Sequence, residues 1–371
     1  MKLLFVFGTR PEVIKLFPVI TEFQNSDFEL KICLTGQHKE MVQPLLDFFQ
    51  IKPDFNLNLM KENQSLEHIT KTVLIQLSEI LEKEKPDYLI VQGDTTTAMA
   101  SALAAFYKKI KIAHIEAGLR TYNKLQPFPE EINRRIIDSV SDLFFAPTET
   151  TKQNLLNEGI QKEKIFVTGN TVIDAFLLTA SKKFNEKGTE LDKIPANKKI
   201  VLVTCHRRES FGKDLENICN AIKEISEFDN ALVVFPVHLN PNIKKTVNLI
   251  LSNQKNILLT NPLSYPLFVH LMKRSYLILT DSGGIQEEAP SLNKPVLVLR
   301  EKTERTEAVK TGAAKIVGTE TKKIVEETKK LFKEEKEYQK MALAENPFGD
   351  GNASKRIFDC FKEIKNGKRK S

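Results

Sequence analysis

The amino-acid sequence predicts an α/β protein with two doubly wound, Rossmann-like domains that face each other across a cleft. The chain has 371 residues, more than the roughly 150 residues of a usual single domain. Short apolar runs rich in β-branched residues recur along it, and helical patterns separate them. These runs are apolar at nearly every position, which is typical of parallel strands that helices cover on both faces.

The expected strands fall into two groups along the chain. In the first half they are residues 2–7, 29–34, 88–91, 110–115 and 143–146. In the second half they are residues 200–204, 232–235, 257–259, 277–280 and 296–299. We expect each half to form its own open sheet, because a helical pattern follows each strand.

The boundary between the two halves is expected close to Asn170. The segment 181–199 is polar and lysine-rich and contains Gly188 and Pro195, so we interpret it as a solvated connection. The predicted domains are residues 1–169 and residues 170–353. A last helix at about 354–366 has apolar residues at helical spacing and is compatible with packing back onto the first domain.

Charge and cysteine content narrow the class of protein. The net charge is +7, but Lys365, Lys368, Arg369 and Lys370 in the tail supply much of it. Trp is absent, and basic patches with interleaved aromatic residues are missing, so we expect a small anionic ligand rather than nucleic acid. The four cysteines have no CxxC spacing, which favours a reducing cytoplasm without a disulfide framework or a zinc site.

Several signals are absent from the sequence. No apolar run approaches the roughly 18 residues of a membrane span, and the N-terminus leads directly into a strand rather than a signal peptide. We therefore expect a soluble, cytoplasmic chain without a membrane segment. No Walker GxxxxGK, no HExxH and no GxGxxG after a strand is present, which argues against a P-loop enzyme, a zinc protease and a dehydrogenase.

In open α/β sheets ligands bind beyond the carboxyl ends of the strands, so the polar residues there are the candidates. The first strand ends in Gly8-Thr9-Arg10-Pro11-Glu12, and Lys15 lies one turn into the helix that Pro11 starts. Arg10 at a helix N-terminus can hold an anion. A plain strand-to-helix turn with an exposed arginine explains the same residues equally well.

Carboxylates follow the next strands. Asp94, in Gln92-Gly93-Asp94-Thr95-Thr96-Thr97, is a candidate, although capping the following helix is the commonest role of an aspartate there. Glu116, in His114-Ile115-Glu116-Ala117-Gly118-Leu119-Arg120, ends a buried strand, where a carboxylate is costly without a partner or a chemical role. Glu130 and Glu131 open a helix, and compensation of the helix dipole explains both. Three carboxylates converging on one cleft, with Glu130 as the third, are less easily explained that way.

The second half offers groups suited to a diphosphate. Ser282-Gly283-Gly284 opens a helix, where backbone amides can approach phosphate, and Glu288 can accept both hydroxyls of a ribose. A plain glycine-rich turn is the alternative. His206 follows a strand beside two arginines and suits a phosphate contact or an acid–base role, whereas His238 is undecided. Residues 300–305 would lie on a neighbouring loop.

As an ordered set these motifs resemble the non-hydrolysing UDP-N-acetylglucosamine 2-epimerases. The resemblance also includes Pro129-Glu130-Glu131-Ile132-Asn133-Arg134 and His206-Arg207-Arg208-Glu209, and it runs to Asn346-Pro347-Phe348-Gly349-Asp350-Gly351, so it covers essentially the whole chain. It implies a two-domain fold like that of the GT-B glycosyltransferases and a homodimer. It also implies interconversion of UDP-N-acetylglucosamine and UDP-N-acetylmannosamine, without cofactor or metal, for surface polysaccharide synthesis.

The resemblance assigns roles to individual residues. The catalytic positions are Asp94, Glu116, Glu130, His206 and Lys15. The substrate-binding positions are Arg10, Lys15, Arg134, His206, Phe268, Ser282, Gly283, Gly284, Glu288 and Arg305, with Phe268 near the uracil. A second, allosteric site would use Gln37, Arg207 and His238. Thr306 replaces the proline of many members, and Glu40 and Asn63 replace two family residues at the second site, which weakens the case for allostery.

The chemistry of the sugar favours elimination. The C2 proton is not next to a carbonyl and is hardly acidic, and oxidation at C3 would need NAD. We therefore expect a carboxylate to remove the C2 proton while UDP leaves from C1, followed by re-addition to 2-acetamidoglucal. Arg10, His206 and the helix start at Ser282 would stabilise the leaving phosphate, and which carboxylate faces C2 is left open. The alternatives are a hydrolysing 2-epimerase, a GT-B glycosyltransferase and an inactive UDP-sugar sensor.

Overall fold

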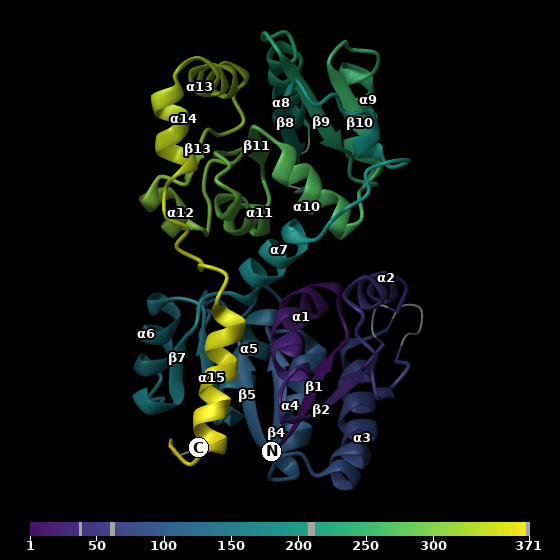
Figure 1. Ribbon diagram of the computed structural model, residues 1–371, viewed down its shortest axis with the longest axis vertical. Coiled ribbons are helices and arrows are strands. Elements are labelled where there is room, and N and C mark those ends of the chain that lie inside the picture. Colours follow the sequence, from purple (N-terminus) through teal and green to yellow (C-terminus); the bar gives the residue numbers. More distant parts are fainter. Residues whose placement is uncertain (37–38, 60–63, 207–211, 369–371) are drawn as a thin grey trace. The chain divides into compact units, whose positions relative to one another are not determined.

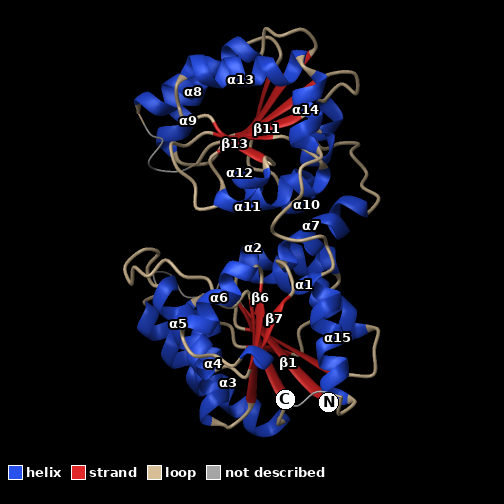
Figure 2. Ribbon diagram, turned by 90° about the vertical axis from the view of Figure 1, so that its left-hand side faces the viewer, coloured by secondary structure: helices blue, strands red, loops and turns tan. Residues whose placement is uncertain are grey.

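The computed structural model describes residues 1–36, 39–59, 64–206 and 212–368 (Figure 1). The chain divides into two compact units: unit 1 is Met1–Ala175 with Gly349–Ser371, and unit 2 is Phe176–Phe348. The division passes through helix α7 (Thr171–Ser181), whereas the sequence placed the boundary just before this helix. Each unit has its own parallel sheet, and Figure 2 shows helices on both sides of the strands, so the predicted fold class is confirmed.

Unit 1 contains a seven-stranded sheet in the order β3-β2-β1-β4-β5-β6-β7. Its strands are β1 (Lys2–Phe7), β2 (Glu29–Leu34), β3 (Phe55–Asn56), β4 (Tyr88–Gln92), β5 (Lys111–Ile115), β6 (Leu143–Ala146) and β7 (Ile165–Val167). Its helices are α1 (Arg10–Gln24), α2 (Lys39–Phe49), α3 (Leu66–Glu84), α4 (Thr96–Tyr107), α5 (Glu130–Val140), α6 (Glu149–Asn157), the start of α7 and α15 (Ala353–Lys365).

The C-terminal helix α15 belongs to unit 1, although the whole of unit 2 precedes it in the chain. It packs against α1, and the Phe361 ring lies against the rings of Phe23, Tyr88 and Phe145. Asp174 of α7 accepts hydrogen bonds from the Ala353 and Ser354 amides and from the Ser354 hydroxyl. Asp174 therefore caps the first turn of α15 from another helix.

Unit 2 contains a six-stranded sheet in the order β10-β9-β8-β11-β12-β13. Its strands are β8 (Lys199–Thr204), β9 (Ala231–Pro236), β10 (Ile257–Thr260), β11 (Leu277–Thr280), β12 (Val296–Val298) and β13 (Ala314–Ile316). Its helices are α8 (Lys213–Ile225), α9 (Pro241–Leu251), α10 (Tyr265–Arg274), α11 (Gly283–Glu288), α12 (Thr306–Thr311), α13 (Thr321–Lys333) and α14 (Glu335–Ala342).

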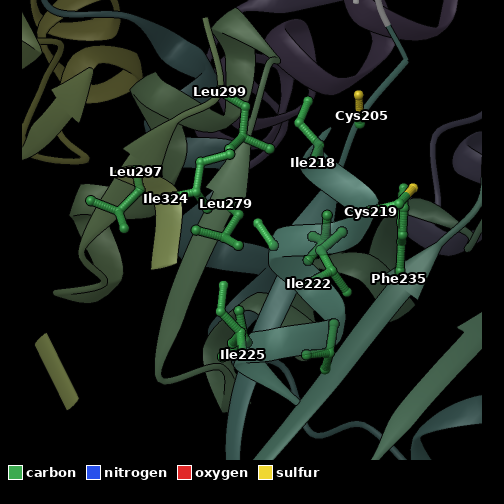
Figure 3. Packing of buried hydrophobic residues seen from close by; sticks show 14 of the residues in the cluster. Cys205, Ile218, Cys219, Ile222, Ile225, Phe235, Leu279, Leu297, Leu299 and Ile324 are labelled. Atoms are coloured by element: carbon green, nitrogen blue, oxygen red, sulfur yellow. The ribbon is translucent and has the colours of Figure 1, made fainter. Parts of the chain in front are cut away.

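The core of unit 2 forms where helix α8 covers the sheet (Figure 3). Ile218 and Ile222, one turn apart on α8, are buried in one cluster with Leu279 of β11 and Leu297 of β12. Each such side chain stabilises the fold by about 1.5–3 kcal/mol when it leaves water. This packing fixes the sheet whose strand ends carry the candidate residues.

The ten expected strands are all present, with each end within one residue of its predicted position. The sequence missed β3, β7 and β13, which lie at sheet edges and are two or three residues long. Most of the segment 181–199 is exposed or half-buried, as expected of a solvated connection, but Leu191 and Ile194 are buried. Arg274 of α10 donates hydrogen bonds to the carbonyls of these two residues and fastens the segment to unit 2.

Candidate active site

In each unit the candidate residues gather where the strand order reverses. In unit 1 the reversal lies between β1, which precedes Arg10, and β4, which precedes Asp94. In unit 2 it lies between β8, which precedes His206, and β11, which precedes Ser282. At such a point two neighbouring loops leave in opposite directions and open a crevice for a ligand.

Glu116 has the most specific environment of the three candidate carboxylates. Its Oε2 atom accepts hydrogen bonds from Lys15 Nζ at 2.5 Å and from the side-chain amide of Gln92. No described residue donates a hydrogen bond to its other oxygen. Glu116 also has φ +70°, a left-handed conformation that costs a non-glycine residue about 1–3 kcal/mol. Two donors and the backbone therefore fix this carboxylate and leave one oxygen available.

Asp94 does not cap the following helix, so the capping interpretation is wrong. The N-cap of α4 is Thr95, whose hydroxyl accepts a hydrogen bond from the Ala98 amide at 3.0 Å. Asp94 instead pairs with Arg134 of α5, whose Nη2 lies 2.5 Å from Asp94 Oδ2. Asn133 of α5 donates to the Asp94 carbonyl at 3.0 Å. Helix α5 thus holds both the backbone and the side chain of Asp94.

The two glutamates that open α5 have different environments. Glu130 is half-buried, and none of the residues in the described ranges donates a hydrogen bond to it. Glu131 is 0% exposed and accepts hydrogen bonds from the amides of Thr121 and Tyr122 at 3.0 and 3.1 Å. Dipole compensation alone is therefore the wrong explanation for Glu131, which clamps the loop between β5 and α5.

Glu12 is a buried residue at this end of unit 1 that the sequence did not single out as functional. It closes the capping box of α1 by accepting hydrogen bonds from the amides of Gly8 and Thr9, and it also accepts one from the Thr95 hydroxyl at 2.7 Å. Burial outweighs these bonds and raises the pKa of the Glu12 carboxyl. The spacing Thr9-x-x-Glu12 was the available signal.

Arg10 is exposed at the first position of α1, and no described residue pairs with its guanidinium. It is therefore accessible to an anion that approaches this helix N-terminus.

In unit 2 a loop residue covers the start of helix α11. Ser282 is the N-cap, and a Cβ atom added to Gly283 would lie 2.8 Å from Arg305 Cζ. Arg305 is itself held by Glu287 at 2.8 Å. Gly283 is thus required for the close approach of the guanidinium, whereas a Cβ on Gly284 would meet nothing within 4 Å. The arrangement puts a cation beside the start of α11.

The backbone amide and the ring of His206 both contact the buried carboxylate of Asp281. Its amide donates to Asp281 Oδ2 at 2.9 Å, and its Nδ1 lies 3.1 Å from Asp281 Oδ1. The His206 side chain is 43% exposed, and its ring lies 6.1 Å from the ring of His238. Phe268 on α10 and Glu288 on α11 are half-buried in the same unit.

Several predicted positions lie outside the described residues. Gln37, Arg207 and Asn63 are among them, and nothing is described of the Glu40 side chain. The second, allosteric site therefore stays a prediction.

The described part of the chain contains no group of three or more His, Cys, Asp or Glu side chains suited to a metal ion. The four cysteines are free and buried, and burial raises the pKa values of the Cys33 and Cys219 thiols to about 12. Within the described ranges, the helices are too short or too polar to cross a membrane.

The two Rossmann-like units define an α/β enzyme of the GT-B-like class. A family model described as UDP-N-acetylglucosamine 2-epimerase matches residues 21–362. The UDP-N-acetylglucosamine 2-epimerases of Campylobacter jejuni and Escherichia coli K12 are 50% identical over 376 residues and 49% identical over 370 residues, and each alignment covers 98% of both chains. The crystal structure of UDP-GlcNAc 2-epimerase from Neisseria meningitidis bound to UDP-GlcNAc is 50% identical, has a TM-score of 0.85, and covers 98% of this chain and 100% of that one. The chain belongs to the UDP-N-acetylglucosamine 2-epimerase family, a family of isomerases, which confirms the resemblance seen in the motifs.

Proposed function

We propose that this chain interconverts UDP-N-acetylglucosamine and UDP-N-acetylmannosamine and releases no free sugar. The observation that carries the proposal is the presence of two separately fixed carboxylates, Asp94 and Glu116, at the ends of the neighbouring strands β4 and β5. Inversion at C2 requires one group to remove a proton and another to return a proton on the opposite face. A pair of carboxylates with different partners suits these two tasks.

The proposed reaction proceeds by elimination and addition. A carboxylate of unit 1 removes the C2 proton, the electron pair of the C2–H bond forms the C1=C2 double bond, and the C1–O bond breaks with its electrons leaving on UDP. UDP then adds again to C1 of 2-acetamidoglucal, and C2 takes a proton on its other face. Because no bond to water forms, the product is a nucleotide sugar.

We assign the sugar to unit 1 and the uridine diphosphate to unit 2. In unit 1 Asp94, Glu116 and Glu130 are the proposed acid–base groups, Lys15 and Arg134 hold two of them, and Arg10 supplies a cation. In unit 2 the proposed ligands are His206, Phe268, Ser282, Gly283, Gly284, Glu288 and Arg305. Negative charge grows on the departing phosphate, so the amides that start α11 and the Arg305 cation would lower the barrier electrostatically.

Incubation with UDP-N-acetylglucosamine in deuterated water, without any acceptor and followed by proton NMR, tests the proposal. We expect UDP-N-acetylmannosamine that carries deuterium at C2. Glu116→Gln is the matched control, because it keeps the size of the side chain and removes the base.

Other products would contradict the proposal in distinct ways. Free N-acetylmannosamine with UDP as the main products would mean a hydrolysing enzyme. Turnover that needs an added acceptor would mean a glycosyltransferase. Tight UDP binding without turnover would mean a UDP-sugar sensor. The expected homodimer, the cytoplasmic location and the role in surface polysaccharide synthesis stay predictions, and sedimentation of the full chain would test the first.

A further inference from the structure

Both ring nitrogens of His114 face oxygen atoms. His114 lies in β5 and is 0% exposed. Its Nδ1 lies 2.6 Å from Asp138 Oδ1, and its Nε2 lies 2.8 Å from the carbonyl oxygen of Gly93. At these distances each nitrogen must take part in a hydrogen bond, because two lone pairs facing each other in a dry interior would repel.

Neither oxygen has a proton to give. The Gly93 carbonyl can only accept a hydrogen bond. Burial opposes the charge on Asp138, but the Arg120 guanidinium, 2.8 Å from Asp138 Oδ2, favours the charged carboxylate independently of His114. Asp138 is therefore a carboxylate, and the His114 ring can satisfy both neighbours only when it carries a proton on each nitrogen.

The charges around His114 are consistent with a cation at this position. Arg120 Nη2 lies 2.8 Å from Asp138 Oδ2 and 2.6 Å from Glu158 Oε2. The Gly118 amide, which is neutral, also donates to Asp138 at 3.3 Å. With His114 protonated, the cations His114 and Arg120 balance the carboxylates Asp138 and Glu158. Glu158 is exposed, so these charges permit an imidazolium at His114 but do not require it, whereas the two hydrogen bonds of the ring do.

This ring controls the backbone that carries a catalytic candidate. The Gly93 amide donates to the Ile115 carbonyl at 3.0 Å, and the Gly93 carbonyl accepts from His114, so β5 holds both polar backbone groups of Gly93. Gly93 has φ +72°, a conformation suited to glycine, and the next residue is Asp94. Glu116 follows His114 by two residues at the end of the same strand.

We propose that His114 is a buried imidazolium that fixes Asp94 relative to Glu116. It is a positioning residue, because its two nitrogens are occupied by Asp138 and Gly93 and cannot reach a substrate. Asp138 lies on α5, the helix that also begins with Glu130 and carries Arg134, so the same contact ties all three candidate carboxylates together. The kinetic consequence rests on the proposed function, whereas the protonation state does not.

Nitrogen-15 NMR of the full wild-type chain tests the protonation state directly. We expect two nitrogen signals for His114 at neutral pH, each coupled to its own bonded proton. His114→Gln identifies these signals by their loss. A ring with one nitrogen that lacks a bonded proton would overturn the proposal, whatever activity the enzyme has.

Kinetics of matched variants test the positioning role. At position 114 the side-chain amide of Asn can replace the Nδ1 donor toward Asp138, and that of Gln can replace the Nε2 donor toward Gly93. Phe replaces neither donor. We expect His114→Phe to lower kcat for epimerisation by about 100-fold, the usual effect of a misplaced catalytic group, with little change in KM. His114→Asn and His114→Gln should each recover part of this loss. His68→Gln, on α3, is the control for histidine removal and should leave kcat unchanged.

The kinetic and NMR measurements distinguish failure of the positioning role from failure of the proposed function. Wild-type kcat in a folded His114→Phe variant would overturn the positioning role. If the wild-type chain showed no epimerase activity, the proposed function would fail, and the NMR experiment would still decide the charge of His114.

Discussion

The strand ends of units 1 and 2 are built differently. In unit 1 Glu116, Asp94 and Glu131 are held by charged or amide side chains and by backbone amides, and Gln92 and Arg134 among these partners are buried. In unit 2 the candidates are backbone amides at the start of α11, the half-exposed His206 and the loop residue Arg305.

This difference corresponds to two kinds of task. Acid–base chemistry needs side chains whose positions are fixed within a fraction of an ångström. The hydrogen bonds that each carboxylate of unit 1 accepts from neighbouring elements can supply that precision. Holding a diphosphate needs many donors of moderate precision, which a helix start and a few cations supply. We therefore expect substitutions in unit 1 to act mainly on kcat and substitutions in unit 2 mainly on affinity.

The largest expected effect is that of Glu116→Gln. The amide keeps the shape of the side chain but cannot accept the C2 proton, so kcat should fall by about 100- to 10,000-fold. Calorimetric titration with UDP should give nearly the affinity of the wild type, because UDP is assigned to unit 2. A kcat within a factor of about ten of the wild type would show that Glu116 is not an acid–base group.

Glu131→Gln should have the next largest effect. Its carboxylate is buried and accepts two backbone hydrogen bonds, and hydrogen bonds to a charged group contribute about 1.5–3 kcal/mol to stability. Loss of this clamp should lower the thermal midpoint and also kcat, because Glu130 begins the same helix. Glu149→Gln makes the same change at an exposed first-turn glutamate of α6 and should do neither. Equal thermal midpoints for the two variants would contradict the clamp.

Gly283→Ala tests the other side of the comparison. The new methyl group would push the Arg305 guanidinium away from the start of α11. We expect UDP affinity to fall about tenfold, or about 1.4 kcal/mol, and kcat at saturating substrate to fall by a smaller factor, because Arg305 also stabilises the charge that grows on the departing phosphate. Gly284→Ala leaves Arg305 in place, so a loss there would report contact with the ligand itself. A drop in kcat without a change in affinity would break the distinction between the units.

The smallest expected effect is a change in the pH dependence of stability in Glu12→Gln. Because burial raises the pKa of Glu12, the folded state favours its protonated form, and wild-type stability is lost as the pH rises through that pKa. Gln has no proton to lose and can still accept from the Gly8 and Thr9 amides. Glu12→Gln should therefore gain stability relative to the wild type as the pH rises, by roughly 1 kcal/mol. Urea unfolding at several pH values measures this, and a gap that narrows with rising pH would contradict the assignment.

The sequence was sufficient for strands that cross a core. Runs such as 2–7 and 277–280 are apolar at nearly every position, because helices cover both faces, and the structure has them at the predicted residues. The edge strand β3 has two residues, and β13 has an exposed lysine at its centre. Such short edges contain too few positions for a pattern to appear.

The strand-end motifs were visible in the sequence, but their partners were not. Gln92 donates to Glu116 across two neighbouring strands, and Asp138 reaches His114 from the far end of α5. These contacts depend on sheet register and on which way a side chain turns. The capping role given to Asp94 failed for a local reason, since the adjacent Thr95 has the better geometry for the cap.

The return of α15 to unit 1 has a consequence for synthesis of the chain on the ribosome. Unit 2 is complete once Phe348 has left the exit tunnel, but the aromatic core around Phe23 and Tyr88 still lacks Phe361 at that moment. Domains usually fold in the order in which they are made. Here the half that is translated first must wait for the last helix, so a nascent chain stopped at residue 348 should contain a folded second half beside an incomplete first half.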